Sequence, residues 1–390
     1  MKPLHITLLF TLLVPLPSYA LKAEKVFSGL TLPWGFEFID DHRLILNEKY
    51  GDISLVDLSN QTKTQLFHVP QLFSDGQGGL MDVKASPFEY DTFYFTYSQR
   101  VGGSGQTALA RARIEDDKFH AWKTLLVTES GSDTSRHFGS RLTFDKQSIY
   151  MTVGERGIRD NAQNLSTHAG SVLRLTPQGQ AFADNPFLTQ PDTQPEIWSY
   201  GHRNPQGIVY DSATSRLWEI EHGPRGGDEI NLVKKGANYG WPLTSHGKEY
   251  WGPVSVGDSK EKEGIESPKH VFTPSIAPGS MVLYKGDKYP ELTGKLLVGA
   301  LKLTHINVLS IEADQSVVER MRLFEDLNER IRQIAVNPQG MISLALIMVT
   351  YTALLNRLVT QNKAITPLSF TLIQGFICIL KQKREYFFWV

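Results

Sequence analysis

Short runs of alternating apolar and polar residues recur along most of the chain, and a polar turn and a second such run follow each of them. An alternation with a period of two is typical of β-strands that have one buried face. This strand–turn–strand unit occurs at residues 35–47, 80–97, 140–154, 207–220, 281–299 and 331–344. Helical periodicity is scarce between these units, so the pattern predicts an all-β protein.

The regular recurrence of the unit predicts a repeat architecture. Six strand pairs that start roughly 45–75 residues apart favour a six-bladed β-propeller, in which each blade is a four-stranded antiparallel sheet around a central channel. A pair of β-sandwiches is the structural alternative. A propeller gathers the loops of all its blades at one face of the axis, so functional side chains are expected at the ends of the units.

The first 20 residues have the features of a secretory signal peptide, and we exclude them from the fold. Lys2 is followed by an apolar segment from Leu4 to Leu16, and Ser18-Tyr19-Ala20 is a small-x-small cleavage site. We therefore expect a periplasmic protein. Cys378 is the single cysteine, so no disulfide within the chain is expected. The 40 Lys and Arg residues nearly balance the 41 Asp and Glu residues, which favours neither nucleic acid nor a membrane surface as partner.

The propeller domain is expected over residues 21–340, because the strand pattern changes in residues 341–390. The segment M-I-S-L-A-L-I-M-V-T-Y that follows Gly340 is continuously apolar. One hypothesis is a shift of the reading frame. Residues 345–355 can be encoded by a set of codons that, when translated from two bases further on, gives a sequence typical of a strand, a turn and a second strand. The alternative is an apolar helix over residues 342–358, buried or in a membrane. Both hypotheses leave the last blade incomplete.

Polar and charged residues cluster at the ends of the predicted units. Gln77 and His137 precede the second and third units, and Glu155 follows the third. The remaining clusters are Arg203-Asn204, His222-Gly223-Pro224, Lys302, Arg330 and Arg332. Four fixed cations with amides and one imidazole predict a pocket for a planar, polyanionic small molecule beside a general base.

The motifs around these residues resemble those of the soluble PQQ-dependent sugar dehydrogenases, in the aldose (glucose/sorbosone) branch. The resemblance covers about residues 24–340 and is specific because several motifs occur in the same order. They are G-Q-G-G-L at 76–80, H-F-G-S-R-L at 137–142, Y-G-H-R-N-P-Q-G at 200–207, E-H-G-P-R-G-G-D-E-I-N at 221–231, N-Y-G-W-P at 238–242, A-L-K at 300–302 and R-I-R at 330–332.

This resemblance implies PQQ and calcium as cofactors. PQQ carries three carboxylates and an ortho-quinone, and the family's contacts to it map to Gln77, Arg203, Asn204, Ala300, Leu301, Lys302, Arg330, Ile331 and Arg332. Calcium prefers oxygen ligands. The resemblance assigns one calcium ion to the backbone carbonyls of Gly223 and Pro224, and a further ion to Glu229 and the carbonyl of Tyr239.

The resemblance also implies the reaction, which is oxidation of aldoses at C1 to lactones. His137 is the expected general base, Glu155 its orienting partner, and Arg203 the cation at the quinone oxygens. Glucose-specific relatives have an Asp at the position of Glu155. An external acceptor (a quinone, cytochrome or dye) is expected to take the electrons, and the protein is expected to be a monomer that needs no membrane. The alternatives are a calcium-dependent lactonase and an inactive binding propeller.

Overall fold

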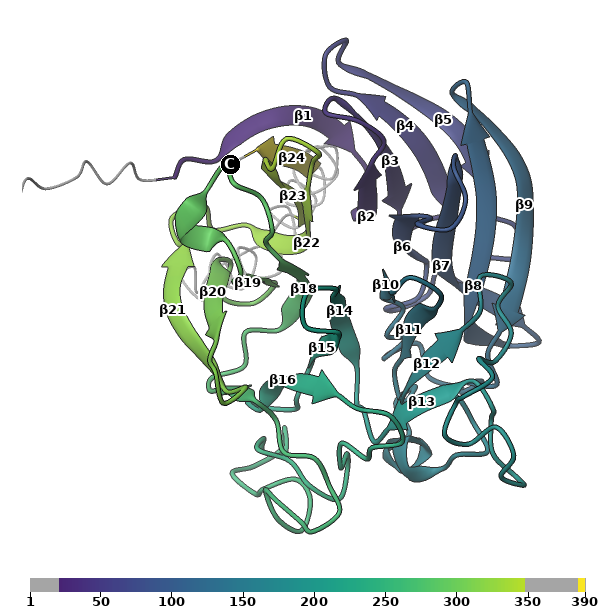
Figure 1. Ribbon diagram of the computed structural model, residues 1–390, viewed down its shortest axis with the longest axis vertical. Coiled ribbons are helices and arrows are strands. Elements are labelled where there is room, and N and C mark those ends of the chain that lie inside the picture. The colour runs from purple at the N-terminus through teal and green to yellow at the C-terminus, as the bar shows by residue number, and fades with distance from the viewer. Residues whose placement is uncertain (1–20, 348–384, 390) are drawn as a thin grey trace, which may run out of the picture.

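The computed structural model describes residues 21–347 and 385–389, and β-strands make up most of its regular structure (Figure 1). Two short 3₁₀ helices are the other described elements, η1 (Arg159–Gln163) and η2 (Pro290–Leu292). Strands such as β3 (Arg43–Glu48) and β15 (Arg216–Glu221) are buried along nearly their whole length. Apolar and β-branched residues suit such strands because they pack on both faces of a sheet.

Five blades are antiparallel sheets of four consecutive strands. The first contains β2 (Pro33–Phe38), β3, β4 (Asp52–Asp57) and β5 (Thr62–His68). The second contains β6 (Leu80–Ala85), β7 (Thr92–Val101), β8 (Ser104–Glu115) and β9 (Lys118–Val127). The third contains β10 (Leu142–Phe144), β11 (Ile149–Val153), β12 (Ser171–Leu175) and β13 (Ile197–Tyr200). The fourth contains β14 (Pro205–Asp211), β15, β16 (Asp228–Val233) and β17 (His270–Phe272). The fifth contains β18 (Pro278–Leu283), β19 (Leu296–Ala300), β20 (Ile306–Ile311) and β21 (Val317–Leu323).

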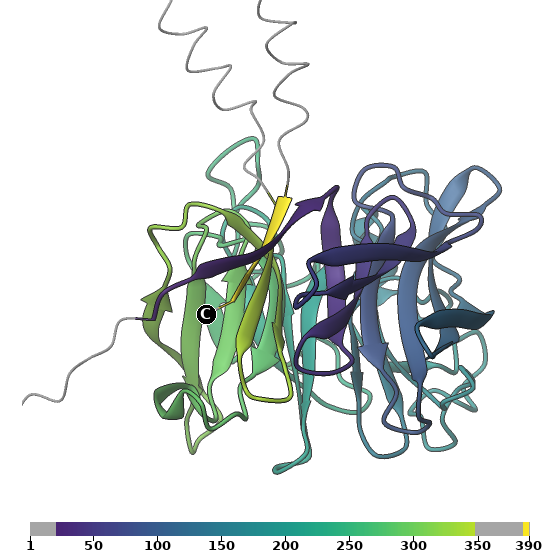
Figure 2. The ribbon, with the colours of Figure 1, turned by 90° about the horizontal axis from the view of Figure 1, so that it is seen from above.

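A sixth sheet combines the two ends of the described chain. Strands β22 (Arg330–Val336) and β23 (Ile342–Ile347) form its inner part. Strand β24 (Glu385–Trp389) pairs between β23 and β1 (Glu24–Leu30), as Figure 2 shows. Strand β23 thus continues this sheet beyond residue 340, where the sequence pattern places the start of the tail. The helix hypothesis is wrong for residues 342–347, which are a strand.

The six predicted strand pairs coincide with the two innermost strands of each sheet. The innermost strands β2, β6, β10, β14, β18 and β22 contact one another in this order around the axis, and β22 also contacts β2. The sequences of the outer strands do not show the alternation of apolar and polar residues by which the inner strands were predicted. Strands β5, β9 and β21 are mostly exposed or half-buried, so their sequences do not alternate clearly.

The hydrophobic core lies between neighbouring sheets. Ile45 and Leu55 of the first blade pack with Phe95 of the second in one cluster of buried side chains. Trp218 of the fourth blade and Val298 of the fifth belong to another such cluster. Because each blade buries both faces against its neighbours, the ring as a whole carries the stability that one sheet alone lacks.

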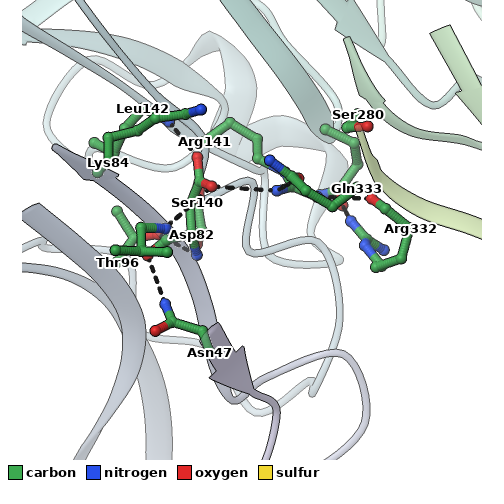
Figure 3. A network of polar contacts seen from close by, with 12 residues as sticks. Asn47, Asp82, Lys84, Thr96, Ser140, Arg141, Leu142, Ser280, Arg332 and Gln333 are labelled. Carbon is green, nitrogen blue, oxygen red and sulfur yellow. Dashed lines mark hydrogen bonds and ion pairs between the residues drawn. The ribbon is translucent and has the colours of Figure 1, made fainter. Parts of the chain in front are cut away.

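The guanidinium of Arg141 crosses the propeller axis just before β10, and Figure 3 shows its contacts. It donates hydrogen bonds to Oε1 of Gln333 at 2.5 Å and to the carbonyl of Gly279 at 2.6 Å. The Asp82 carboxylate lies 3.4 Å away and also accepts a hydrogen bond from the amide of Leu142 at 2.9 Å. Arg141 therefore ties the third blade to the second, the fifth and the sixth sheet.

The predicted signal peptide at residues 1–20 and the reading-frame hypothesis for the tail, apart from β23 and β24, lie outside the described residues. Within residues 21–347 and 385–389, no helical segment has the length and hydropathy that a bilayer span requires.

Candidate active site

The predicted site residues lie at one end of the innermost strands. Gln77, His137 and Arg203 precede β6, β10 and β14, and Arg330 begins β22. The second strand of each sheet runs back to the same end, so residues that follow β11, β15 and β19 also arrive there, as Glu155 does. Hydrogen bonds from His137 to Gln77, from His137 to Glu155 and from Glu155 to Arg203 connect three of these sheets.

A cavity of about 150 Å³ opens between these strand ends. Its lining combines apolar side chains with amides, an imidazole and two guanidinium groups, and includes no carboxylate among the described residues. The residues are Trp34, Gln77, Met81, Phe138, Asn204, Gln206, His222, Ala277, Leu301, Arg330 and Arg332.

His137 and Glu155 form a buried imidazole–carboxylate pair. Nδ1 of His137 lies 2.7 Å from Oε2 of Glu155, which also accepts a hydrogen bond from the amide of Gly157 at 2.6 Å. The backbone amide of His137 donates to Oε1 of Gln77 at 2.8 Å, and its φ of 57° places it in the left-handed region. With its proton on Nδ1 facing the carboxylate, the imidazole keeps the Nε2 lone pair for another group.

The surroundings of His137 favour the neutral imidazole. Burial lowers its pKa from the ordinary value, and the nearby Arg203 guanidinium acts in the same direction. The hydrogen bond from His137 to Glu155 and the charge of this carboxylate raise the pKa of His137 but do not cancel the lowering. His137 is therefore ready to accept a proton at neutral pH.

Arg203 and Asn204 are held by Glu221, a residue that the sequence reasoning missed. Oε2 of Glu221 accepts hydrogen bonds from the backbone amides of both residues. The Arg203 guanidinium donates to the carbonyls of His222 and Gly223, each at 3.0 Å, and lies 5.1 Å from the ring centroid of Trp241. This anchoring fixes the turn that leads into β14.

Arg330 and Arg332 carry positive charge into the cavity from β22. The guanidinium of Arg332 lies 4.4 Å from the ring centroid of Trp34 and donates to the carbonyl of Gly279 at 3.1 Å and to Gln206. Burial lowers the pKa of both arginines, and Arg141 lowers that of Arg332 further. The Nε atoms of Arg203, Arg330 and Arg332 have no hydrogen-bond partner, and none of these three residues forms an ion pair with a described carboxylate.

The other predicted cofactor contacts differ in how far they are exposed to solvent. Ala300, Leu301 and Ile331 are buried, and Leu301 lines the cavity. Lys302 is exposed, and its backbone amide donates to the carbonyl of Ile276 at 3.0 Å. Lys302 is thus at the outer rim.

The predicted calcium ligands lie in the fourth blade. The carbonyl of Gly223 accepts a hydrogen bond from Arg203 at 3.0 Å and retains a second lone pair. Pro224 is buried beside it. Glu229 is on β16 and pairs with Glu221 of β15 across the sheet. Tyr239 directs its hydroxyl to the carbonyl of Leu232 at 2.6 Å.

Three further residues of the site were missed by sequence reasoning. Gln206 lies 3.3 Å from Asn204 and also accepts a hydrogen bond from Arg332, so it links two of the predicted contacts. It belongs to the motif Y-G-H-R-N-P-Q-G, which was the available signal. Trp34 and Arg141 gave no such signal, because their roles depend on strands that are distant in sequence.

Comparisons with known proteins agree with this geometry. A family profile described as Glucose / Sorbosone dehydrogenase matches residues 30–348. Aldose sugar dehydrogenase YliI of Escherichia coli is 37% identical over 327 residues, which cover 81% of this chain and 87% of the relative. Quinoprotein glucose dehydrogenase B of Acinetobacter calcoaceticus is 26% identical over 420 residues, covering 84% and 87%.

A solved structure shows the same arrangement of sheets. The soluble aldose sugar dehydrogenase from Escherichia coli in its apo-form superposes with a TM-score of 0.82 at 31% identity, covering 95% of this chain and 99% of that one. The chain therefore belongs to the glucose/sorbosone dehydrogenase family of oxidoreductases that act on sugars.

Proposed function

We propose that the protein oxidises aldose sugars at C1 to lactones, with PQQ as its cofactor and an external molecule as electron acceptor. One observation carries the proposal. The side chains of Arg203, Arg330 and Arg332 have no carboxylate partner among the described residues, and a buried pair of His137 and Glu155 lies next to Arg203. Arg203 and Arg332 are buried and Arg330 is half-buried, so an anionic ligand would compensate their charge, and the imidazole provides a base beside it.

The residues present fit PQQ. Its three carboxylates need cations, and the three guanidinium groups each retain an unpaired Nε atom. Arg330, Arg332 and Lys302 would hold carboxylates, with Gln77, Asn204, Ala300, Leu301 and Ile331 around them. When bound, PQQ supplies an ortho-quinone that takes a hydride equivalent from C1 of the sugar.

His137 performs the proton transfer in this proposal. Its Nε2 accepts the proton of the hydroxyl group at C1, which leaves the oxidised carbon as the carbonyl of a lactone. Glu155 keeps the other nitrogen protonated and stabilises the imidazolium that forms. Arg203 is close enough to His137 to lower its pKa, and its guanidinium stabilises negative charge that develops beside the pair.

In this proposal calcium is an ion that oxygen atoms of this chain bind. Gly223, Pro224, Glu229 and Tyr239 supply carbonyl or carboxylate oxygens, which calcium prefers. We assign calcium no role in proton transfer, which His137 performs. Export of the mature protein to the periplasm, where an acceptor is accessible, completes the proposal and is tested by cell fractionation.

No observation favours the two alternative functions. A lactonase site of the kind considered uses carboxylates at the axis, whereas the cavity lining has none among the described residues. An inactive binding propeller does not require the His137–Glu155 pair.

Reconstitution of the purified protein tests the proposed function. The protein is incubated with PQQ and calcium, then given glucose or other aldoses and an artificial dye. We expect dye reduction that depends on both PQQ and sugar, with a lactone as product. Protein without PQQ is the control, and circular dichroism establishes that the sample is folded. Absence of dye reduction with every aldose in a folded, PQQ-saturated sample contradicts the proposal.

A further inference from the structure

A second polar cluster is buried in the fourth blade. Glu219 and Glu221 are two positions apart on β15, so their side chains lie on the same face of the sheet. Asn231 of β16 is opposite Glu219 on the same face. His202, from the turn before β14, completes the cluster. All four residues are 2% exposed or less.

The cluster contains more negative charge than the described residues compensate. Neither glutamate has a lysine or arginine ion-pair partner, and the neighbouring Arg203 directs its guanidinium to the carbonyls of His222 and Gly223. Glu229 of β16 lies opposite Glu221 and adds a third carboxylate to this face of the sheet. Two buried carboxylates without a cation are unfavourable unless a proton or a metal ion is bound between them.

Three buried atoms of the cluster have no hydrogen-bond partner: Nδ1 of His202, Oε1 of Glu219 and Oδ1 of Asn231. Nε2 of His202 lies 2.9 Å from Oγ of Ser199, and the imidazole stacks on the ring of Tyr239 at 4.6 Å between centroids. A proton on Nε2 that is donated to Ser199 leaves the Nδ1 lone pair facing the glutamates. Metal-binding histidines are commonly fixed by such a hydrogen bond from the second ring nitrogen.

The separations between these atoms suit ligands of one shared ion. Nδ1 of His202 lies 3.8 Å from Oε2 of Glu219 and 3.6 Å from Oε1 of Glu221, and one ligand atom of each residue lies within 4.8 Å of the other two. These distances are too long for hydrogen bonds. Ligands bound at about 2.1 Å in a tetrahedron are about 3.4 Å apart, so a small contraction brings these atoms into contact with an ion.

We propose that His202, Glu219 and Glu221 bind a divalent transition-metal ion, beside the side-chain amide of Asn231, whose Nδ2 donates to Oε2 of Glu219 at 3.1 Å. A mixed set of imidazole and carboxylate ligands suits Zn²⁺ or Mn²⁺ better than Ca²⁺, which prefers oxygen alone. This set adjoins, but does not include, Glu229, which lies opposite Glu221 and which the family resemblance assigns to calcium together with the Tyr239 carbonyl.

The ion would also fix the cofactor-binding turn, a consequence that rests on the proposed function. Glu221 binds the ion through Oε1, while its Oε2 accepts hydrogen bonds from the amides of Arg203 and Asn204. Loss of the ion is therefore expected to loosen both residues and to weaken PQQ binding.

Metal analysis of the cofactor-free protein tests the site independently of activity. Protein produced with supplementary Zn²⁺ or Mn²⁺ is expected to retain one equivalent per chain by elemental analysis. Titration of metal-depleted protein with Zn²⁺, Mn²⁺ or Ca²⁺ alone is expected to raise the melting temperature for the transition metals. Wild-type protein that is folded but binds neither Zn²⁺ nor Mn²⁺ overturns the proposal, whatever its activity.

Two variants locate the site. Glu219→Gln is expected to weaken Zn²⁺ or Mn²⁺ binding at least 100-fold, whereas the exposed Glu263→Gln is the matched control and leaves binding unchanged. Glu229→Gln is expected to retain transition-metal binding, because Glu229 is outside the ligand set. Metal binding that survives in folded Glu219→Gln, or that is lost in Glu229→Gln but not in Glu219→Gln, assigns the ion elsewhere and overturns the proposal.

Discussion

Nδ1 of His137 lies 2.7 Å from Oε2 of Glu155, because the start of β10 and the end of β11 meet at the open end of the third blade's first hairpin. Such a pair fixes the tautomer of the imidazole and leaves its Nε2 atom toward the substrate side. The predictions below separate this pair from the cations that surround it.

His137→Ala is expected to lower turnover by about 10²–10⁴-fold, the usual share of general base catalysis, and to leave PQQ affinity largely unchanged. Steady-state dye reduction and a PQQ titration measure the two effects. The exposed His120→Ala is the matched control. If His137→Ala abolishes PQQ binding, His137 is a cofactor ligand and its role as base is wrong.

Glu155→Gln is expected to lower turnover by at least tenfold, because an amide neither fixes the Nδ1 proton nor stabilises the imidazolium. Glu155→Asp keeps the charge and is expected to retain more activity than the Gln variant. Both are measured at saturating PQQ. Equal activity of Glu155→Gln and the wild type contradicts an orienting role for the carboxylate.

The rate is expected to fall on the acid side with an apparent pKa below 6.5, the ordinary value for histidine. Burial lowers the pKa of His137, so the neutral base persists to lower pH than in a free imidazole. The depressed pKa also adds stability that is present above pH 6.5 and is lost as the pH falls through the folded-state pKa. In Glu155→Gln the acid limb is expected to move to still lower pH, because Glu155 raises the pKa of His137. The profile of kcat/KM against pH tests both statements, and a midpoint above 6.5 contradicts them.

Arg203→Ala is expected to weaken PQQ binding and also to reduce turnover at saturating PQQ. The guanidinium compensates ligand charge in the bound state and developing charge during the reaction. Equilibrium titration and dye reduction measure these effects, with the exposed Arg113→Ala as control. Unchanged PQQ affinity in Arg203→Ala, together with lost affinity in His137→Ala, inverts the two assignments.

Arg141→Met is expected to destabilise the protein by about 3–5 kcal/mol, the usual cost of breaking a buried ion pair from one side. The substitution removes the hydrogen bonds to Gln333 and Gly279 and leaves the Asp82 carboxylate without its guanidinium. Urea unfolding measures the change, and Arg113→Met is the exposed control. A loss below about 1 kcal/mol would show that the axis tolerates an unpaired Asp82.

The sequence predicted the inner half of every sheet but only part of the site. Inner strands such as β2 and β22 alternate in polarity or are apolar throughout, whereas outer strands such as β5 contact solvent on most of their surface. Residues in compact motifs, such as His137 and Arg203, were identified because several unusual residue types occur together in a turn.

Residues whose role arises from three-dimensional proximity could not be predicted in this way. Trp34 stacks on Arg332, which is almost 300 positions later in the chain, and no local pattern marks Trp34. Glu219 and Glu221 looked like ordinary polar positions of an alternating strand. The sequence alone does not show that their side chains lie close to that of His202, because this proximity depends on how the turn before β14 packs against β15.

The hydrogen bond from Arg141 to Gln333 joins residues that are 192 positions apart. Closing so long a loop has a high entropic cost, and folds dominated by such distant contacts assemble slowly. During refolding this bond forms only after the intervening blades have arranged themselves around the axis. Since Gln333 directly follows Arg332, the ability to bind an anionic cofactor is expected to appear in the slowest kinetic phase of refolding, after most of the β-structure has formed.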